Sequence, residues 1–190
     1  MGLHEYPILT KILELAAPPT DLKIRERALK YFIDNFKEKY SKDYNSDYVK
    51  VDFLPCLDPN IYAKPSECFI NPECTVMNFK VIRQDLRFYV ERFGVCQHPS
   101  SEKLLSRLIE DPPQDENDAR KIFEYLHSQQ GGFTPFNWSH LTNLKFIPIR
   151  DKNRPYSILH TNPRSCFFES QEERYVYTPP FFILFFLIYE

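Results

Sequence analysis

The stretch VDFLPCLDPNIYAKPSECFINP, residues 51–72, decides how this chain is built, because parts of it occur twice. VDFLP is echoed by LKFIP, and KPSECF is echoed by NPRSCFF, each roughly 95 residues later in the same order. Such ordered recurrence predicts an internal duplication. The positions that recur as structural elements of the repeat are Phe53, Pro55, Pro65, Cys68 and Phe69 in the first copy, and Phe146, Pro148, Pro163, Cys166 and Phe167 in the second.

A further repeated signature lies upstream, where PPTD at residues 18–21 returns as PPQD at residues 112–115. Paired prolines end a helix, and the aspartate or threonine that follows accepts hydrogen bonds from the free amides of the next helix. The segments that follow carry apolar residues at three- and four-residue steps, which is typical of amphipathic helices. The sequence therefore predicts helices over 22–40 and 116–130.

Short strands are predicted around the recurring prolines. YVKVDFLP and NLKFIPI alternate apolar and polar residues and stop at proline, as strands do. ECFI and SCFFES are each long enough for one more strand, and we expect the two strands of each copy to pair with each other in antiparallel fashion. Between the copies, VIRQDLRFYVERFGV predicts a connecting helix that ends at Gly94.

These elements predict a helix-rich α+β fold made of two tandem, similar modules, each with capped helices and a short strand pair. We place module 1 at residues 5–79, the connecting helix at 80–99 and module 2 at 100–178. A hydrophobic tail, 179–190, departs from the repeat. Its nine apolar residues would rise only about 14 Å as a helix, against about 30 Å of bilayer hydrocarbon, so a buried strand or an aberrant end is favoured over membrane contact.

Composition excludes several functional classes. A formal net charge of −2 gives no overall field that would attract nucleic acid. Four glycines beside sixteen prolines leave no Walker loop, dinucleotide fingerprint or nucleophile elbow. The five cysteines form an odd set without a secretory signal before them, which indicates reduced thiols and a cytoplasmic or nuclear setting. No cofactor and no catalytic residue is predicted.

One set of side chains offers a metal-binding hypothesis, although its spacing lacks the tight knuckle of a structural zinc site. An alternative interpretation makes Cys68 and Cys166 small buried residues beside phenylalanines. No local pattern places a base beside a thiol, so cysteine catalysis is not expected. The candidate metal ligands are Cys68, Cys74, Cys96 and His98.

Three stretches carry a resemblance to a known family: VDFLPCLD…AKPSECFINPECTVMNF, DLRFYVERFGV…HPSSEKLLSRLIEDPP and FIPIR…TNPRSCFF, which together cover most of residues 5–170. They resemble a fungal family of unknown function, domain of unknown function 3684. Its members look like distant relatives of sacsin and of plant No-vein proteins. The resemblance implies a long parent protein with a chaperone-type GHKL ATPase domain towards its N-terminus.

The resemblance transfers no activity, because the Asn-bearing helix and Gly-rich lid motifs of a GHKL site are not found in this sequence. It implies a fragment downstream of the ATPase, and the tail after Tyr177 departs from the family pattern. We therefore expect a non-catalytic structural or interaction segment whose partners are proteins, above all neighbouring modules of the parent chain. The alternative is a small Cys/His metal-binding module.

Overall fold

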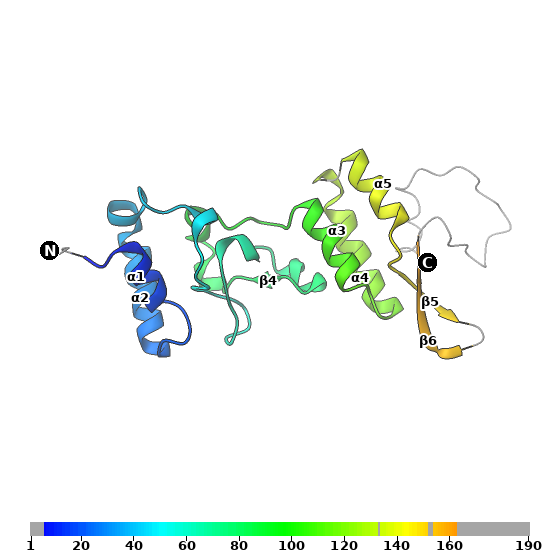
Figure 1. Ribbon diagram of the computed structural model, residues 1–190, viewed down its shortest axis with the longest axis horizontal. Helices are drawn as coiled ribbons and strands as arrows, with labels where there is room; N and C mark the ends of the chain where they lie inside the picture. The colour runs from blue at the N-terminus through cyan, green and yellow to red at the C-terminus, as the bar shows by residue number, and fades with distance from the viewer. Residues whose placement is uncertain (1–5, 133, 152–153, 163–190) are drawn as a thin grey trace. The chain divides into compact units, whose positions relative to one another are not determined.

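The chain folds as two compact units, residues 1–98 and 99–190 (Figure 1). The computed structural model describes residues 6–132, 134–151 and 154–162. Helices make up most of the described elements, and the strands form three separate pairs, two antiparallel and one parallel. This confirms the predicted α+β class. The tail at 179–190 lies outside the described residues.

Unit 1 begins with a helix pair on either side of the paired prolines. Helix α1, Leu9–Leu15, packs against α2, Leu22–Asn35, and a π-helical turn η1, Phe36–Tyr40, extends α2 to the predicted end (Figure 1). The Asp21 side chain caps α2 by accepting from the backbone N–H of Lys23 at 2.9 Å. The helix therefore starts where local chemistry predicts.

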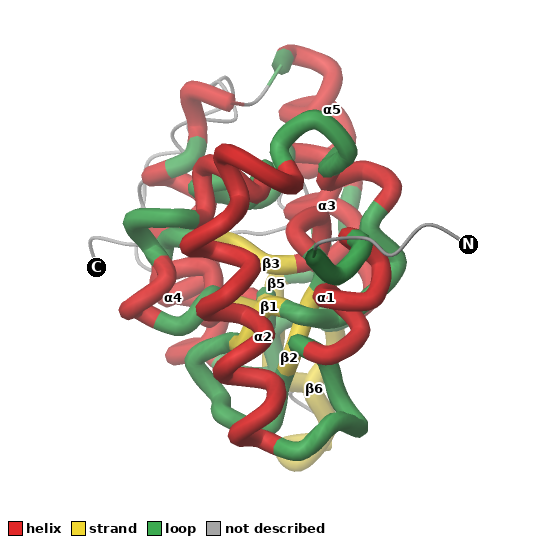
Figure 2. The backbone as a smooth tube through the Cα atoms, turned by 90° about the vertical axis from the view of Figure 1, so that its left-hand side faces the viewer, coloured by secondary structure: helices red, strands yellow, loops and turns green. Residues whose placement is uncertain are grey.

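The strands of unit 1 are short, two residues each (yellow in Figure 2). Strand β1, Leu54–Pro55, pairs antiparallel with β2, Tyr62–Ala63, and β3, Cys68–Phe69, pairs parallel with β4, Lys80–Val81. The predicted pairing of 54–55 with the ECFI strand is wrong. A tight turn, in which the N–H of Ile61 donates to the carbonyl of Asp58 at 3.0 Å, reverses the direction of the chain just after β1. Strand β1 therefore pairs with β2, which is closer to it in sequence than ECFI.

The connecting helix predicted at 80–99 is also wrong. After β4 the chain forms two 3₁₀ turns, η5 at Gln84–Leu86 and η6 at Val90–Phe93. The N–H of Ile82 donates to the carbonyl of Phe69, and the N–H of Arg83 donates to that of Pro55, both at 3.0 Å. These bonds to distant backbone hold the start of the segment extended. The apolar residues of the segment that enter the core of unit 1 are Ile82, Leu86, Val90, Phe93 and Val95. Further 3₁₀ turns are η2 (Ser46–Tyr48), η3 (Pro65–Glu67) and η4 (Pro72–Met77).

An aromatic cluster forms the centre of unit 1. The ring of Phe32, which is fully buried, lies 5.1 to 5.8 Å from the five rings around it, centroid to centroid. Offset and edge-on arrangements of this kind are the favourable ones for aromatic pairs. The surrounding rings are those of Phe36, Tyr40, Tyr44, Phe53 and Phe93.

Unit 2 again begins with two helices separated by paired prolines. Helix α3, Ser101–Glu110, is capped by Ser100, and α4, Glu116–Ser128, is capped by Asp115, which accepts from the N–H of Asp118 at 2.8 Å. After the 3₁₀ turn η7, Gln130–Gly132, helix α5, Pro135–Asn143, lies against α3.

The chain of unit 2 then forms a hairpin of strands β5, Ile147–Asp151, and β6, Arg154–Thr161, in which Pro148 pairs with His160 and β5 lies against α4. The strand predicted to pair with β5, SCFFES, lies outside the described residues. So do the second-copy positions Pro163, Cys166 and Phe167.

Candidate functional site

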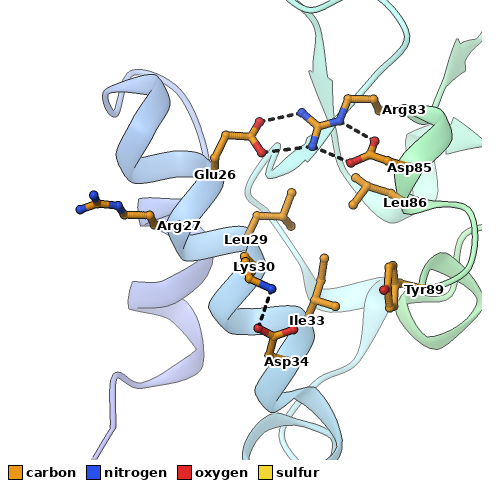
Figure 3. Close-up of a pocket in the computed structure, with 10 residues that line it drawn as sticks. All are labelled: Glu26, Arg27, Leu29, Lys30, Ile33, Asp34, Arg83, Asp85, Leu86 and Tyr89. Atoms are coloured by element: carbon orange, nitrogen blue, oxygen red, sulfur yellow. Dashed lines mark hydrogen bonds and ion pairs between the residues drawn. The ribbon is translucent and has the colours of Figure 1, made fainter.

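A groove runs between α2 and the segment 83–89 in unit 1 (Figure 3). Its volume is about 450 Å³. The helix contributes one continuous face, because its lining residues recur at three- and four-residue steps. The lining residues are Glu26, Arg27, Leu29, Lys30, Ile33, Asp34, Arg83, Asp85, Leu86 and Tyr89.

Arg83 joins the two walls of the groove. Its Nη1 and Nη2 donate to the two carboxylate oxygens of Glu26 on α2 at 2.6 and 3.1 Å. Its Nε and Nη2 donate to the oxygens of Asp85 at 2.7 and 3.0 Å. Hydrogen bonds to Glu26 and then to Asp85 raise the pKa of the Arg83 guanidinium, so the cation is held firmly. The cluster is accessible to solvent, since the Glu26 and Asp85 side chains are 42% and 59% exposed.

The helix face of the groove also carries charged side chains outside the Arg83 cluster. Lys30 and Asp34, one turn apart on α2, form an ion pair at 3.1 Å. Figure 3 shows Arg27 pointing away from the groove. The lining residues as a whole hold three carboxylates and three cations, so the one unbalanced carboxylate belongs to the cluster of Arg83, Glu26 and Asp85 and not to the groove in general.

Apolar side chains lie between the two charged pairs. Leu29 of α2 and Leu86 of η5 are buried, and Ile33 is half-buried beside them. Tyr89 stands on the opposite wall with 38% of its surface exposed (Figure 3). The groove thus combines an apolar floor with a charged end, the usual composition of a site that recognises a ligand by shape and orients it by charge.

Sequence reasoning missed this groove. Glu26 and Arg83 are 57 positions apart, and no local pattern links them. The spacing of the charged residues on α2 is as compatible with a solvent-exposed helix face as with a binding site. The only local signal was Asp85, two residues after Arg83, and that spacing is too common to indicate a site.

The four predicted metal ligands come from two segments that do lie side by side. Phe69 forms a parallel bridge with Cys96, and the N–H of Asn71 donates to the carbonyl of Gln97 at 3.1 Å. Cys68 and Cys74 are buried, Cys96 is exposed and His98 is half-buried.

The side chains of these segments make other contacts instead of a ligand set. Nε2 of His98 lies 3.3 Å from the side-chain amide of Asn71, and the Cys74 thiol lies 3.9 Å from the carbonyl oxygen of Gln97. Across residues 6–132, 134–151 and 154–162, no three His, Cys, Asp or Glu side chains gather in a way that would hold a metal ion. The structure gives no support to the metal-binding alternative.

The buried thiols near this region are held in their neutral form. Burial raises the pKa of Cys68 to about 12 and that of Cys56 to about 11. The Cys68 Sγ donates to the carbonyl of Lys64 at 3.3 Å. A nucleophilic cysteine needs a thiolate and a lowered pKa, so these two thiols are unsuited to that chemistry.

The fold and the site together define an α+β protein with a charged groove on α2 and two neutral thiols in its core. The chain belongs to the family described as "Protein of unknown function (DUF3684)", whose model matches residues 1–184. Comparison with curated proteins finds no match, and comparison with solved structures finds none either. In the part of the chain that the structure describes, no helix has the length and apolar character needed to cross a membrane.

Proposed function

We propose that this chain is a non-catalytic structural and interaction segment of a larger, chaperone-like fungal protein, and that a protein partner docks in the α2 groove. The observation that carries the docking role is the bridge from Arg83 to Glu26 and Asp85. It fixes both walls of the groove and leaves an apolar floor between them. Preorganised walls lower the entropic cost of binding.

The proposal also holds that the segment consists of two copies of one structural unit. In each copy a capping aspartate follows paired prolines, Asp21 before α2 and Asp115 before α4. In each copy the phenylalanine before the first proline-bearing strand is buried: Phe53 is 0% exposed and Phe146 is 1% exposed. These correspondences support a duplication whose role is structural.

The parent protein is proposed from the resemblance to sacsin-like and No-vein-like chains, with a GHKL ATPase domain elsewhere and a cytoplasmic or nuclear location. The partner is then a neighbouring module of that parent chain. Sequencing the transcript and the genomic locus around codons 170–190 tests this part. A reading frame that joins an ATPase domain supports it, and a locus without any such domain contradicts it.

The non-catalytic role is tested on the purified chain itself. We expect no hydrolysis of ATP by the chain, and we expect isothermal titration calorimetry to detect binding when it is titrated with the neighbouring modules of the parent protein. Glu26→Gln should weaken that binding, whereas Glu38→Gln, an exposed carboxylate outside the groove, should not. ATP turnover by the chain would overturn the proposal.

A further inference from the structure

We propose that the α2 groove recognises a short basic and apolar protein segment, whose lysine or arginine is held by the carboxylates of Glu26 and Asp85 beside an aliphatic side chain on the groove floor. This inference rests on the proposed docking role and specifies the chemistry of the partner.

Charge selects a cation over an anion at this site. Arg83 neutralises one of the two carboxylates that it contacts, so the cluster of Glu26, Asp85 and Arg83 keeps one negative charge. Both carboxylates remain open to solvent, and a carboxylate offers more acceptor sites than the bonds to Arg83 occupy. An incoming ammonium or guanidinium group would neutralise the remaining negative charge of the cluster. An incoming carboxylate would instead bring the net charge of the cluster to −2.

Tyr89, on the wall opposite α2, also favours a cation as the ligand. Tyr89 exposes its ring towards the groove (Figure 3), and a phenol ring attracts cations through its negative face. The same protein already uses this contact elsewhere, since the guanidinium carbon of Arg25 lies 4.6 Å from the ring centroid of Tyr62. Figure 3 shows Tyr89 across from Ile33, away from the Arg83 cluster, so its ring adds a second cation-attracting group further along the groove.

The apolar floor of the groove favours an aliphatic residue next to the basic residue in the bound segment. Leu29, Ile33 and Leu86 offer no side-chain hydrogen-bonding group, so only an apolar side chain can cover them without losing hydrogen bonds to water. The helix face from Glu26 to Asp34 is about 12 Å long at the α-helical rise, which matches about four residues of extended chain. The groove therefore fits a short peptide segment.

The test uses the whole chain and two fluorescent tetrapeptides with blocked ends, one alternating leucine with lysine and one alternating leucine with glutamate. Fluorescence anisotropy at low salt should show the lysine peptide binding about fivefold or more tightly than the glutamate peptide. The preference should shrink at 1 M salt, where charges are screened.

Three variants locate the binding. Asp85→Asn should weaken the lysine peptide about two- to fivefold, and Glu38→Gln, outside the groove, should leave it unchanged. Lys30→Gln removes a competing cation from the groove face while leaving the Arg83 bridge intact, and it should strengthen binding by a similar factor, provided that circular dichroism shows a folded chain. This gain of affinity separates recognition from a loss of stability, because an unfolded variant cannot bind more tightly.

Two results would overturn the inference. Tighter binding of the glutamate peptide would show that the charge assignment is wrong, while the docking role of the groove would stand. Failure of both peptides to bind would remove the groove as a docking site. Neither result bears on the parent reading frame, so failure here is distinguishable from failure of the proposed chaperone-like context.

Discussion

Phe123 and Phe146 pack edge to face, with ring centroids 5.4 Å apart and an interplanar angle of 82°. The same relationship occurs in unit 1, where Phe53 meets Phe32 at 5.6 Å and 87°. In both units the helix that follows the paired prolines supplies one ring, and the residue before the first proline-bearing strand supplies the other. In each unit this contact therefore joins the helix to the strand that follows it in the chain.

The first prediction concerns these two contacts. Phe53→Ala and Phe146→Ala should each lower the free energy of unfolding by about 3–5 kcal/mol, because each leaves a cavity in a fully packed core. Urea denaturation followed by circular dichroism measures the loss. Phe88→Ala is the matched control: this residue is 88% exposed, and the change should stay within about 0.5 kcal/mol. A loss below about 1 kcal/mol at either buried position would contradict the assignment.

The second prediction concerns the bridge across the groove. Arg83→Gln should lower the free energy of unfolding by about 1 kcal/mol, a modest loss because all three charged groups are partly exposed to water. The difference from the unchanged protein should shrink at 1 M salt. Lys30→Gln breaks an exposed pair on the same helix and should cost less than about 0.5 kcal/mol. Equal effects of the two substitutions would show that Arg83 does not join the walls.

Local chemistry explains what the sequence could predict. The helices at α2 and α4 begin where an aspartate follows paired prolines, since capping and helix termination act within a few residues. The end of η6 at Gly94 was predicted for the same reason: its φ of 72° is a backbone conformation that glycine adopts without strain.

Long-range pairing explains what the sequence could not predict. The helical spacing of apolar residues after Val81 is real, yet backbone hydrogen bonds from Ile82 and Arg83 to Phe69 and Pro55 keep the chain extended there. The groove escaped notice because the charges of Glu26 and Arg83 meet only after folding. In both cases the deciding partner is remote in sequence, and periodicity carries no information about it.

The third prediction concerns alkaline pH. The folded state raises the pKa of Cys68 to about 12, from an unperturbed 9.0, because the thiol is buried. Above pH 9 the unfolded chain loses this proton while the folded chain keeps it, so the unfolded state binds fewer protons and stability falls as pH rises. The loss from this group is at most about 1.4 kcal/mol per pH unit between pH 9 and 12.

Urea denaturation at pH 8, 9, 10 and 11 measures that slope. Cys68→Ala should make it shallower, because the buried thiol no longer titrates. Val81→Ala is the control, since it truncates a buried side chain on the neighbouring strand without removing an ionisable group, and it should lower stability equally at each pH. An identical slope in the Cys68→Ala variant and the unchanged protein would show that the thiol has no part in alkaline unfolding.

The fourth prediction concerns Gly94, which ends η6 in a left-handed conformation. A Cβ added there would lie 2.5 Å from Oγ and 2.7 Å from Cβ of Ser46, closer than real contacts allow. Gly94→Ala should therefore lower the free energy of unfolding by about 2 kcal/mol or more, through backbone strain and this clash together. Urea denaturation gives the value.

A matched control and a second-site variant separate the two causes at Gly94. A Cβ added at Gly131 would meet no atom within 4 Å, so Gly131→Ala should change stability by less than about 0.5 kcal/mol. Adding Ser46→Gly to Gly94→Ala removes both close contacts and should restore the part of the loss that comes from the clash, leaving only the backbone strain. If the double variant is no more stable than Gly94→Ala alone, the left-handed backbone accounts for the whole effect, and the contact with Ser46 contributes nothing.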